Sequence, residues 1–176
     1  FTETFGEFLA LRRAQGTEDV HAKTAVIVRD VRERGGEAVA QYTQRFDGVK
    51  LDPDTLTADG IDLFEAAERC NQDVREALDF AAIRIESYHA QQRPQDHSFI
   101  DPAGLELGWR WTAVDAVGLY VPGGRASYPS SVLMNAVPAR AAGVKRIVMT
   151  SPVPGGQLSP AAASAALRAG VTGVHP

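Results

Sequence analysis

The chain has 176 residues, enough for one ordinary domain, and its 44% hydrophobic and 23% charged residues are typical of a soluble globular protein with a net charge of −4. No apolar run approaches the roughly 20 residues of a membrane-spanning helix, which argues against a membrane protein. The single cysteine, Cys70, excludes an internal disulfide, so we expect a cytoplasmic protein in which Cys70 is a small buried residue.

Residues 1–93 are predicted to form an acidic helical region. Apolar residues recur at helical spacing from Val20 to Val31, and Gly35-Gly36 should end that helix. The same spacing continues to Phe46, where Asp47-Gly48 predicts a turn. These helices need another surface to pack against, because each carries apolar residues on one face.

Two more helices are expected before a change in character near residue 94. One lies around Ile61 to Cys70, and Asn71 is a suitable N-cap for a longer one that ends before Pro94. The predicted apolar face of the longer helix consists of Val74, Ala77, Leu78, Ala81, Ile85 and Tyr88.

A β-hairpin is predicted next, within a boundary segment of residues 94–115. Asp101-Pro102-Ala103-Gly104 is a turn signal, and the residues after it alternate strictly between apolar and other types. The alternating apolar residues are Leu105, Leu107, Trp109 and Trp111. We expect them to form one arm of a hairpin with both tryptophans on the same face. Gln91–Ser98, QQRPQDHS, is the best candidate for a domain boundary.

From residue 116 the sequence predicts strands and helices in alternation. The expected strands are Val117–Val121, Arg146–Thr150 and Val171–His175. The first expected helix is Ser131–Ala142, with a kink at Pro138 and a cap at Gly143. The second is Pro160–Ala169, capped by Gly170. A βαβαβ succession implies a parallel sheet. The predicted fold class is therefore α/β: an N-terminal helical region, an attached hairpin and an incomplete Rossmann-like parallel sheet.

Charge divides the chain at the start of this sheet. The 22 acidic residues all lie between Glu3 and Asp115, where 13 basic residues leave a net charge of −9. Residues 116–176 hold five basic residues and no acidic residue. Two interpretations stay open: a buried parallel sheet simply holds few charges, or this half faces an anionic ligand. The scattered basic residues argue against a nucleic-acid partner.

The stretch VGLYVPGGRASYPSS, residues 117–131, is the best candidate for a ligand site. It follows a predicted strand, and Gly123-Gly124 would let a ligand approach the backbone closely. It is a poor nucleotide motif, because it lacks both G-x-G-x-x-G and the acidic residue about 20 positions later. A hydrolase nucleophile among Ser127, Ser130 and Ser131 is disfavoured, because no G-x-S-x-G elbow surrounds them.

The four histidines are not spaced as metal ligands. None of them pairs with another His, Cys or carboxylate at such a spacing, including His21, and His89 lies beside an apolar helical stripe, where a packed histidine is expected. His97 is placed in the boundary loop and His175 at the end of a strand. Composition and pattern alone therefore give no complete catalytic apparatus within the chain.

The residues nevertheless resemble a known family. VDAVGLYVPGGRASYPSSVLMNAVPARAAGVKRIVMTSPVPGG is similar to the most characteristic block in the front half of the histidinol dehydrogenase family. VRERGGEAVAQYTQRFDG and IESYHAQQ extend the resemblance towards the N-terminus. AGVTGVHP matches the point where family members run on into a Gly-Gly-Ala-Gln segment, so we expect this chain to be the front part of a longer protein.

The resemblance implies a zinc-dependent enzyme that uses two NAD to oxidise L-histidinol through L-histidinal to L-histidine. It also implies a homodimer whose active sites borrow residues from the partner subunit. The zinc ligands and the catalytic Glu-His pair of the family would lie beyond Pro176, so no catalytic or metal residue is assigned in this chain. Residues 116–176 would be the truncated start of the NAD-binding domain.

One cofactor contact is carried over with the resemblance: Tyr120 in GLYVPGG matches a family tyrosine that contacts NAD. Pro122 is expected in the same pocket, and Phe46 is expected to be a buried core residue rather than a third contact. Two alternatives stay open. The chain belongs to a same-fold dehydrogenase of another small alcohol, such as a sulfonated diol, or it is a non-catalytic fragment that ends at Pro176.

Overall fold

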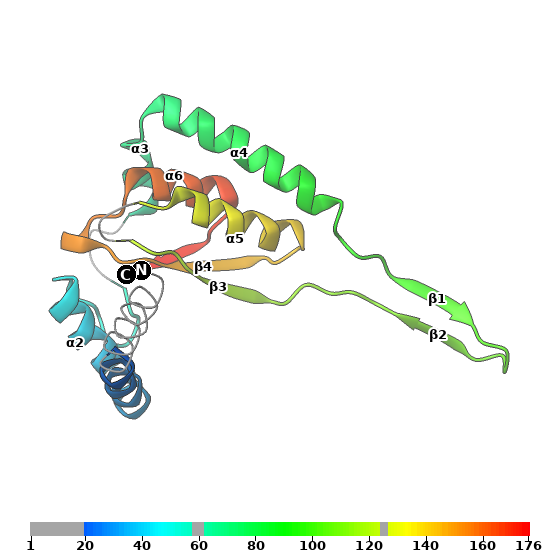
Figure 1. Cartoon of the computed structure of the whole chain (residues 1–176), viewed down its shortest axis with the longest axis horizontal. Helices are drawn as coiled ribbons and strands as arrows, with labels where there is room; N and C mark the ends of the chain where they lie inside the picture. Colours follow the sequence, from blue (N-terminus) through cyan, green and yellow to red (C-terminus); the bar gives the residue numbers. More distant parts are fainter. Residues whose placement is uncertain (1–19, 58–61, 124–126) are drawn as a thin grey trace, which may run out of the picture.

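The computed structural model describes residues 20–57, 62–123 and 127–176. Helices and strands alternate after residue 115, and the earlier helical segments 63–68 and 72–90 pack on the outside of that part (Figure 1). The parallel sheet and the antiparallel hairpin that the sequence predicted are both present. The fold is therefore of the expected α/β class, with a three-stranded sheet, two inner helices and an outer layer.

The N-terminal helices begin and end where local sequence signals predict. Residues 20–34 are helical, and the helix ends at Gly35, which has a φ of 58°. Helix α2 (Gly36–Phe46) follows, then α3 (Leu63–Glu68) and α4 (Gln72–Ala90). Asn71 caps α4 as expected, because its side chain accepts a hydrogen bond from the N–H of Asp73 at 2.9 Å. Among the described residues, no helix is long and apolar enough to cross a membrane.

The predicted apolar face of α4 is only partly correct. Leu78 is buried as expected, but Val74 is 39% and Tyr88 65% exposed, and the second buried residue of the helix is Ala82. The predicted stripe is too wide because α4 lies in the outer layer and contacts α5 and α6 along one side only, where Leu78, Ala81, Ala82 and Ile85 pack. Phe80 and Ile83 are therefore left exposed on the outer side of the helix.

The sheet consists of three parallel strands in the order β3-β4-β5. They are β3 (Ala116–Tyr120), β4 (Arg146–Thr150) and β5 (Gly173–His175), connected by α5 (Pro129–Ala141) and α6 (Pro160–Ala169). The bounds of β4 and α6 are those predicted. The predicted caps are also present, since Gly143 and Gly170 have φ values of 97° and 83°. Helix α5 continues through Pro138 to Ala141.

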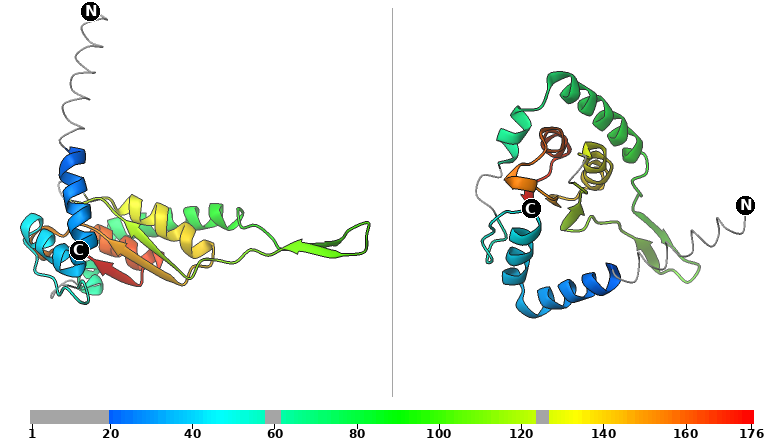
Figure 2. Two further views of the ribbon diagram at one scale, coloured as in Figure 1. Left: turned by 90° about the horizontal axis from the view of Figure 1, so that it is seen from below. Right: turned by 60° about the vertical axis from the view of Figure 1, so that its left-hand side comes forward.

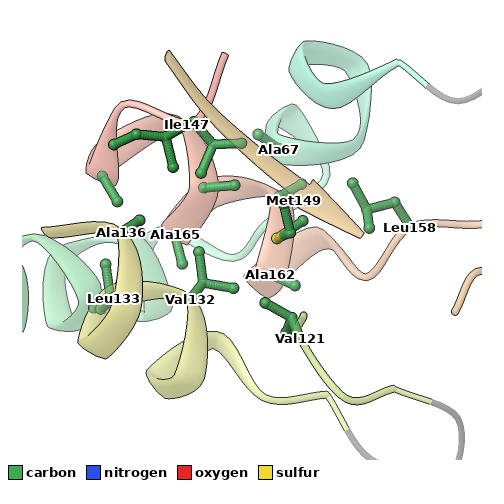
Figure 3. Close-up of a cluster of buried hydrophobic side chains, with 14 of the residues drawn as sticks. Ala67, Val121, Val132, Leu133, Ala136, Ile147, Met149, Leu158, Ala162 and Ala165 are labelled. Carbon is green, nitrogen blue, oxygen red and sulfur yellow. The ribbon is translucent and has the colours of Figure 1, made fainter. Parts of the chain in front are cut away.

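The core lies between the sheet and its two connecting helices (Figure 3). Ile147 and Met149 of β4 point towards α5 and α6 and are almost fully buried, as is Leu133 of α5. The adjoining face of α6 is made of alanines, which let the helices approach closely: Ala162, Ala163, Ala165, Ala166 and Ala169. The outer helices α3 and α4 pack on α6, so one continuous core joins them to the sheet.

The second face of the sheet is open (Figure 2, left). Ala116, Gly118 and Tyr120 are exposed on β3, and their register partners on β4 include Arg146 and Thr150, which are also exposed. A parallel sheet is normally covered on both faces. Further structure is therefore expected to cover this face in the complete protein.

The hairpin extends far from the rest of the molecule (Figure 1). Its strands are β1 (His97–Ile100) and β2 (Glu106–Trp109), joined by the predicted turn, in which the carboxylate of Asp101 accepts hydrogen bonds from the N–H groups of Ala103 and Leu105. His97 therefore lies in a strand and not in the boundary loop, because it pairs with Trp109. One face of the hairpin carries exposed apolar side chains: Phe99, Leu105, Leu107 and Trp109.

Candidate functional site

A small cavity of about 300 Å³ lies beyond the carboxyl ends of β3 and β4. Residues after both strands line it, together with residues at the start of α6. Ligands bind at this edge of open α/β sheets, because the helices that follow the strands direct free N–H groups towards it. Its volume is at the lower end of the range for ligand pockets, which suits part of a dinucleotide.

Three serine hydroxyls face this cavity. The hydroxyl of Ser159, the N-cap of α6, donates a hydrogen bond to the hydroxyl of Ser127 at 2.7 Å. The same oxygen accepts a long hydrogen bond, 3.5 Å, from the N–H of Ala162. Ser151 follows β4 and is only 5% exposed. Its side chain lines the cavity beside Gly123.

The two predicted cofactor residues lie on different sides of the sheet edge. Pro122 lines the cavity with Gly123, on the side covered by the helices. Tyr120 points to the open face and is 68% exposed. Thr150 and His175 are its neighbours in the same row, because Tyr120 pairs with Thr150 and Thr150 with His175. The predicted Gly124 lies outside the described residues.

A tight loop of residues 52–57 holds His175 at the other end of this row. The Nδ1 atom of His175 lies 3.0 Å from the carbonyl oxygen of Leu56, whose φ of 54° is unusual for a residue other than glycine. The carboxylate of Asp52 accepts hydrogen bonds from the N–H groups of Asp54 and Thr55, and these hydrogen bonds lower the pKa of Asp52. The loop thus directs a backbone carbonyl at the sheet edge.

The remaining predicted residues contribute nothing to the cavity. Phe46 was expected in the core, but it is 60% exposed at the end of α2, where its ring stacks on Tyr42 and lies under Arg45. Its position in the last turn of an amphipathic helix explains the error, because no later element of the described structure covers that turn. Cys70 is buried, as predicted.

Histidines are dispersed across the described structure. His21 is exposed on the first helix, and His89 is half-buried with its ring edge against Tyr88. His97 packs between Phe99 and Trp109 on the hairpin, with ring centroids 5.9 Å and 4.9 Å away. Within residues 20–57, 62–123 and 127–176, no three His, Cys, Asp or Glu side chains are grouped as a metal site.

Ion pairs between the layers join the acidic N-terminal part of the chain to the basic C-terminal part. Arg140 of α5 lies 3.1 Å from the carboxylate of Glu86, and Arg168 of α6 lies 2.8 Å from that of Asp79, both on α4. These two arginines hold the acidic outer helix on the basic half. The cavity itself is lined by no charged side chain of the described residues, so its attraction for an anion would come from helix ends and hydroxyl groups.

A larger hollow of about 1340 Å³ lies at the base of the hairpin. It is open between the two extended segments that lead to the hairpin, and it faces the C-terminal ends of α4 and α5. Helix C-termini disfavour anions, and the charged residues that line this hollow balance one another, Arg93 and Lys145 against Asp96 and Asp115. We therefore place the candidate site at the smaller cavity.

Ser151 lines the cavity but was not among the residues that the sequence predicted there. The segment SPVPGG reads as an ordinary Pro/Gly loop, and a serine after a strand carries no distinctive motif. The only available signal was its place after the second strand, at the edge where parallel strands present ligand contacts. That Ser151 is buried beside the cavity depends on how the two loops meet in space.

Comparison with known proteins identifies the family. The family model described as "Histidinol dehydrogenase" matches residues 10–176. Histidinol dehydrogenase from Agrobacterium fabrum is 52% identical over 178 residues, and that from Mesorhizobium japonicum is 50% identical over 175 residues. Each match covers 99% of this chain, which spans only 40% of the length of each relative.

A solved structure shows the same arrangement. The crystal structure of histidinol dehydrogenase from Elizabethkingia anophelis superposes with a TM-score of 0.76 at 26% sequence identity. The match covers 90% of this chain and 36% of that one. The fold of the described residues is therefore that of the corresponding part of this relative.

Proposed function

Because the chain belongs to the histidinol dehydrogenase family, we propose that it forms the N-terminal part of a cytoplasmic enzyme that oxidises L-histidinol through L-histidinal to L-histidine in histidine biosynthesis. Two hydride transfers to NAD would take place per histidinol. The observation that carries the proposal is the family match over almost the whole chain, at about half identity to relatives with that name. In this role residues 116–176 begin the NAD-binding domain.

The carboxyl edge of the sheet fits part of an NAD molecule. The cavity at the start of α6 offers hydroxyl donors and no acidic side chain, which suits a phosphate group. The aromatic ring of Tyr120 is exposed on the open face of the sheet, beside this edge, and a ribose or a planar base can pack on it. We propose that the dinucleotide crosses this edge, with Pro122 on one side and Tyr120 on the other. NAD would supply the hydride acceptor.

Zinc does not fit the described residues, because they group no three potential ligands. We propose that the zinc ligands and the catalytic acid-base pair belong to the part that the relatives have beyond the matched 40%. No catalytic step is therefore assigned to a residue of this chain.

The division into a helical region (1–93), a boundary segment (94–115) and a sheet half (116–176) also remains a proposal, although the outer helices and the sheet share one core.

Activity of the complete enzyme tests this function. We expect two NADH to form per histidinol consumed, and no NADH with a sulfonated diol in place of histidinol. The 176-residue chain alone should show no turnover and should retain no stoichiometric zinc after dialysis, as measured by metal analysis. Turnover only with another alcohol, or zinc bound by the isolated chain, would contradict the proposal.

We also propose that the complete enzyme is a homodimer. The apolar face of the hairpin supports this, because a two-stranded hairpin is marginally stable in water without a surface to pack against. Light scattering at micromolar concentration should report twice the subunit mass. Leu107→Glu on the apolar face should weaken the dimer, while Ser98→Glu on the opposite face serves as the control. A monomeric wild-type enzyme would refute the homodimer.

A further inference from the structure

We propose that residues 47–57, here called the strap, position the wall of the small cavity, and that His175 is the positioning residue through which the strap acts. The strap follows α2 in the chain and lies against the carboxyl edge of the sheet. The inference deepens the proposed function, and it rests on that function only for NAD as the ligand whose binding reports the effect.

The strap is hydrogen-bonded to structure at the ends of two neighbouring strands. The N–H of Gly155, in the loop after β4, donates a hydrogen bond to the carbonyl oxygen of Asp47 at 3.2 Å. At the end of β5, the Nδ1 atom of His175 lies 3.0 Å from the carbonyl oxygen of Leu56. Because a carbonyl oxygen only accepts, Nδ1 carries the proton of this hydrogen bond. One segment from the N-terminal half therefore holds both strand ends.

Both hydrogen bonds lead directly to the cavity. Gly155 lies between Pro154 and Gln157, which line it. The backbone carbonyl oxygen of His175 accepts a hydrogen bond from the N–H of Ser151 at 3.1 Å, and Ser151 also lines the cavity. A displacement of the strap would therefore move two parts of the cavity wall.

The strap itself is anchored in the core and against α2. Val49 and Leu51 are buried, and they belong to the same core cluster as Val153, which begins the cavity loop after β4. At the start of α2, Gly36 lies so close to the carbonyl oxygen of Pro53 that a Cβ atom would overlap it. Apolar burial at one end and close backbone packing at the other fix the strap relative to the sheet.

The turn that presents the Leu56 carbonyl is held in a strained conformation. Leu56 has a φ of 54°, which costs free energy in a residue with a Cβ atom. Its N–H donates a hydrogen bond to the carbonyl oxygen of Asp52 at 2.8 Å. The carboxylate of Asp52 accepts two more, from the N–H groups of Thr55 and Asp54, and these lower its pKa. Backbone strain persists only where the surroundings impose it, and here they aim the carbonyl at His175.

The test compares three variants of the complete enzyme. Asp52→Ala opens the turn from an exposed position outside the cavity lining, and His175→Phe removes the donor but keeps a ring. We expect each to raise the dissociation constant of NAD by about three- to tenfold, the effect of one lost hydrogen bond, as measured by isothermal titration calorimetry. The KM for NAD should rise in parallel, while kcat changes less. His175→Asn keeps an N–H donor near the position of Nδ1 and should restore most of the affinity.

Hydrogen–deuterium exchange reports the strap directly. In Asp52→Ala and His175→Phe, peptides covering residues 47–57 and 151–157 should exchange faster than in the wild type, while those of α4 keep their rates. Asp54→Ala, in the same turn, leaves the Asp52 carboxylate in place and is the matched control. It should keep wild-type exchange and wild-type NAD affinity.

The other outcomes overturn the inference or separate it from the proposed function. Wild-type NAD affinity in both Asp52→Ala and His175→Phe, with or without a lower melting temperature, would show that the strap only stabilises the fold. A loss in His175→Phe alone, or one that His175→Asn does not restore, would show that the ring acts directly and is not positioned by the strap. If the wild type does not bind NAD but exchange responds as expected, the strap stands and the proposed function fails.

Discussion

Replacing Tyr120 by alanine in the complete enzyme is expected to weaken NAD binding by about five- to 150-fold. The substitution removes an aromatic surface and one hydroxyl group, together worth roughly 1–3 kcal/mol. Because the side chain is 68% exposed on the open face of the sheet, its loss should leave the folded structure intact. Titration of NAD against the variant measures the effect, with zinc content and histidinol affinity expected to change little.

Tyr120→Phe is the matched control for this prediction. It keeps the ring and removes only the hydroxyl group, so it should retain most of the NAD affinity if stacking dominates. A thermal melt of both variants detects any loss of stability. Wild-type NAD affinity in Tyr120→Ala would show that the residue is not part of the dinucleotide site.

Replacing Gly36 by alanine should lower the free energy of unfolding by roughly 1–3 kcal/mol, as expected for overpacking. Gly36 begins α2, and a Cβ atom there would overlap the carbonyl oxygen of Pro53. That oxygen belongs to the backbone of the loop 52–57, so the whole loop must move. Because Leu56 in the same loop contacts His175, the displacement should reach the sheet edge.

Gly118→Ala provides the comparison for Gly36→Ala. Both glycines lack a positive φ, but a Cβ atom at Gly118 would meet no atom within 4 Å among the described residues. We expect chemical denaturation of the 176-residue chain to show a loss for Gly36→Ala and little change for Gly118→Ala. An NMR shift of the His175 ring in Gly36→Ala would report the loop displacement. Equal stability of the two variants would contradict the predicted clash.

The predictions from sequence succeeded where local chemistry determines the structure. The bounds of β4 and α6 follow from short apolar runs between Gly and Pro residues, which restrict the backbone directly. Asn71 and Gly170 marked helix ends for the same reason. These signals act within a few residues, so they do not depend on the rest of the fold.

The errors concern features that depend on tertiary packing. Tyr88 and Phe46 lie on apolar helical stripes, but whether such a stripe is buried depends on which other elements reach it. The resemblance placed Tyr120 and Pro122 in one NAD pocket, and this stays a prediction. The sheet edge separates them, since Tyr120 still follows the alternation of β3 and Pro122 lies past its end.

The packing of α4 on α5 and α6 has a consequence for synthesis on the ribosome. Helix α4 ends at Ala90, but its partner α6 ends at Ala169, so about 80 residues must be added before the contact surface is complete. At the usual elongation rate of about 5–20 residues per second, this takes roughly 4–16 s. Until α6 is complete, the apolar side of α4, including Leu78, is not fully covered and is accessible to chaperones. Slow elongation after residue 90 should therefore prolong chaperone association with the nascent chain.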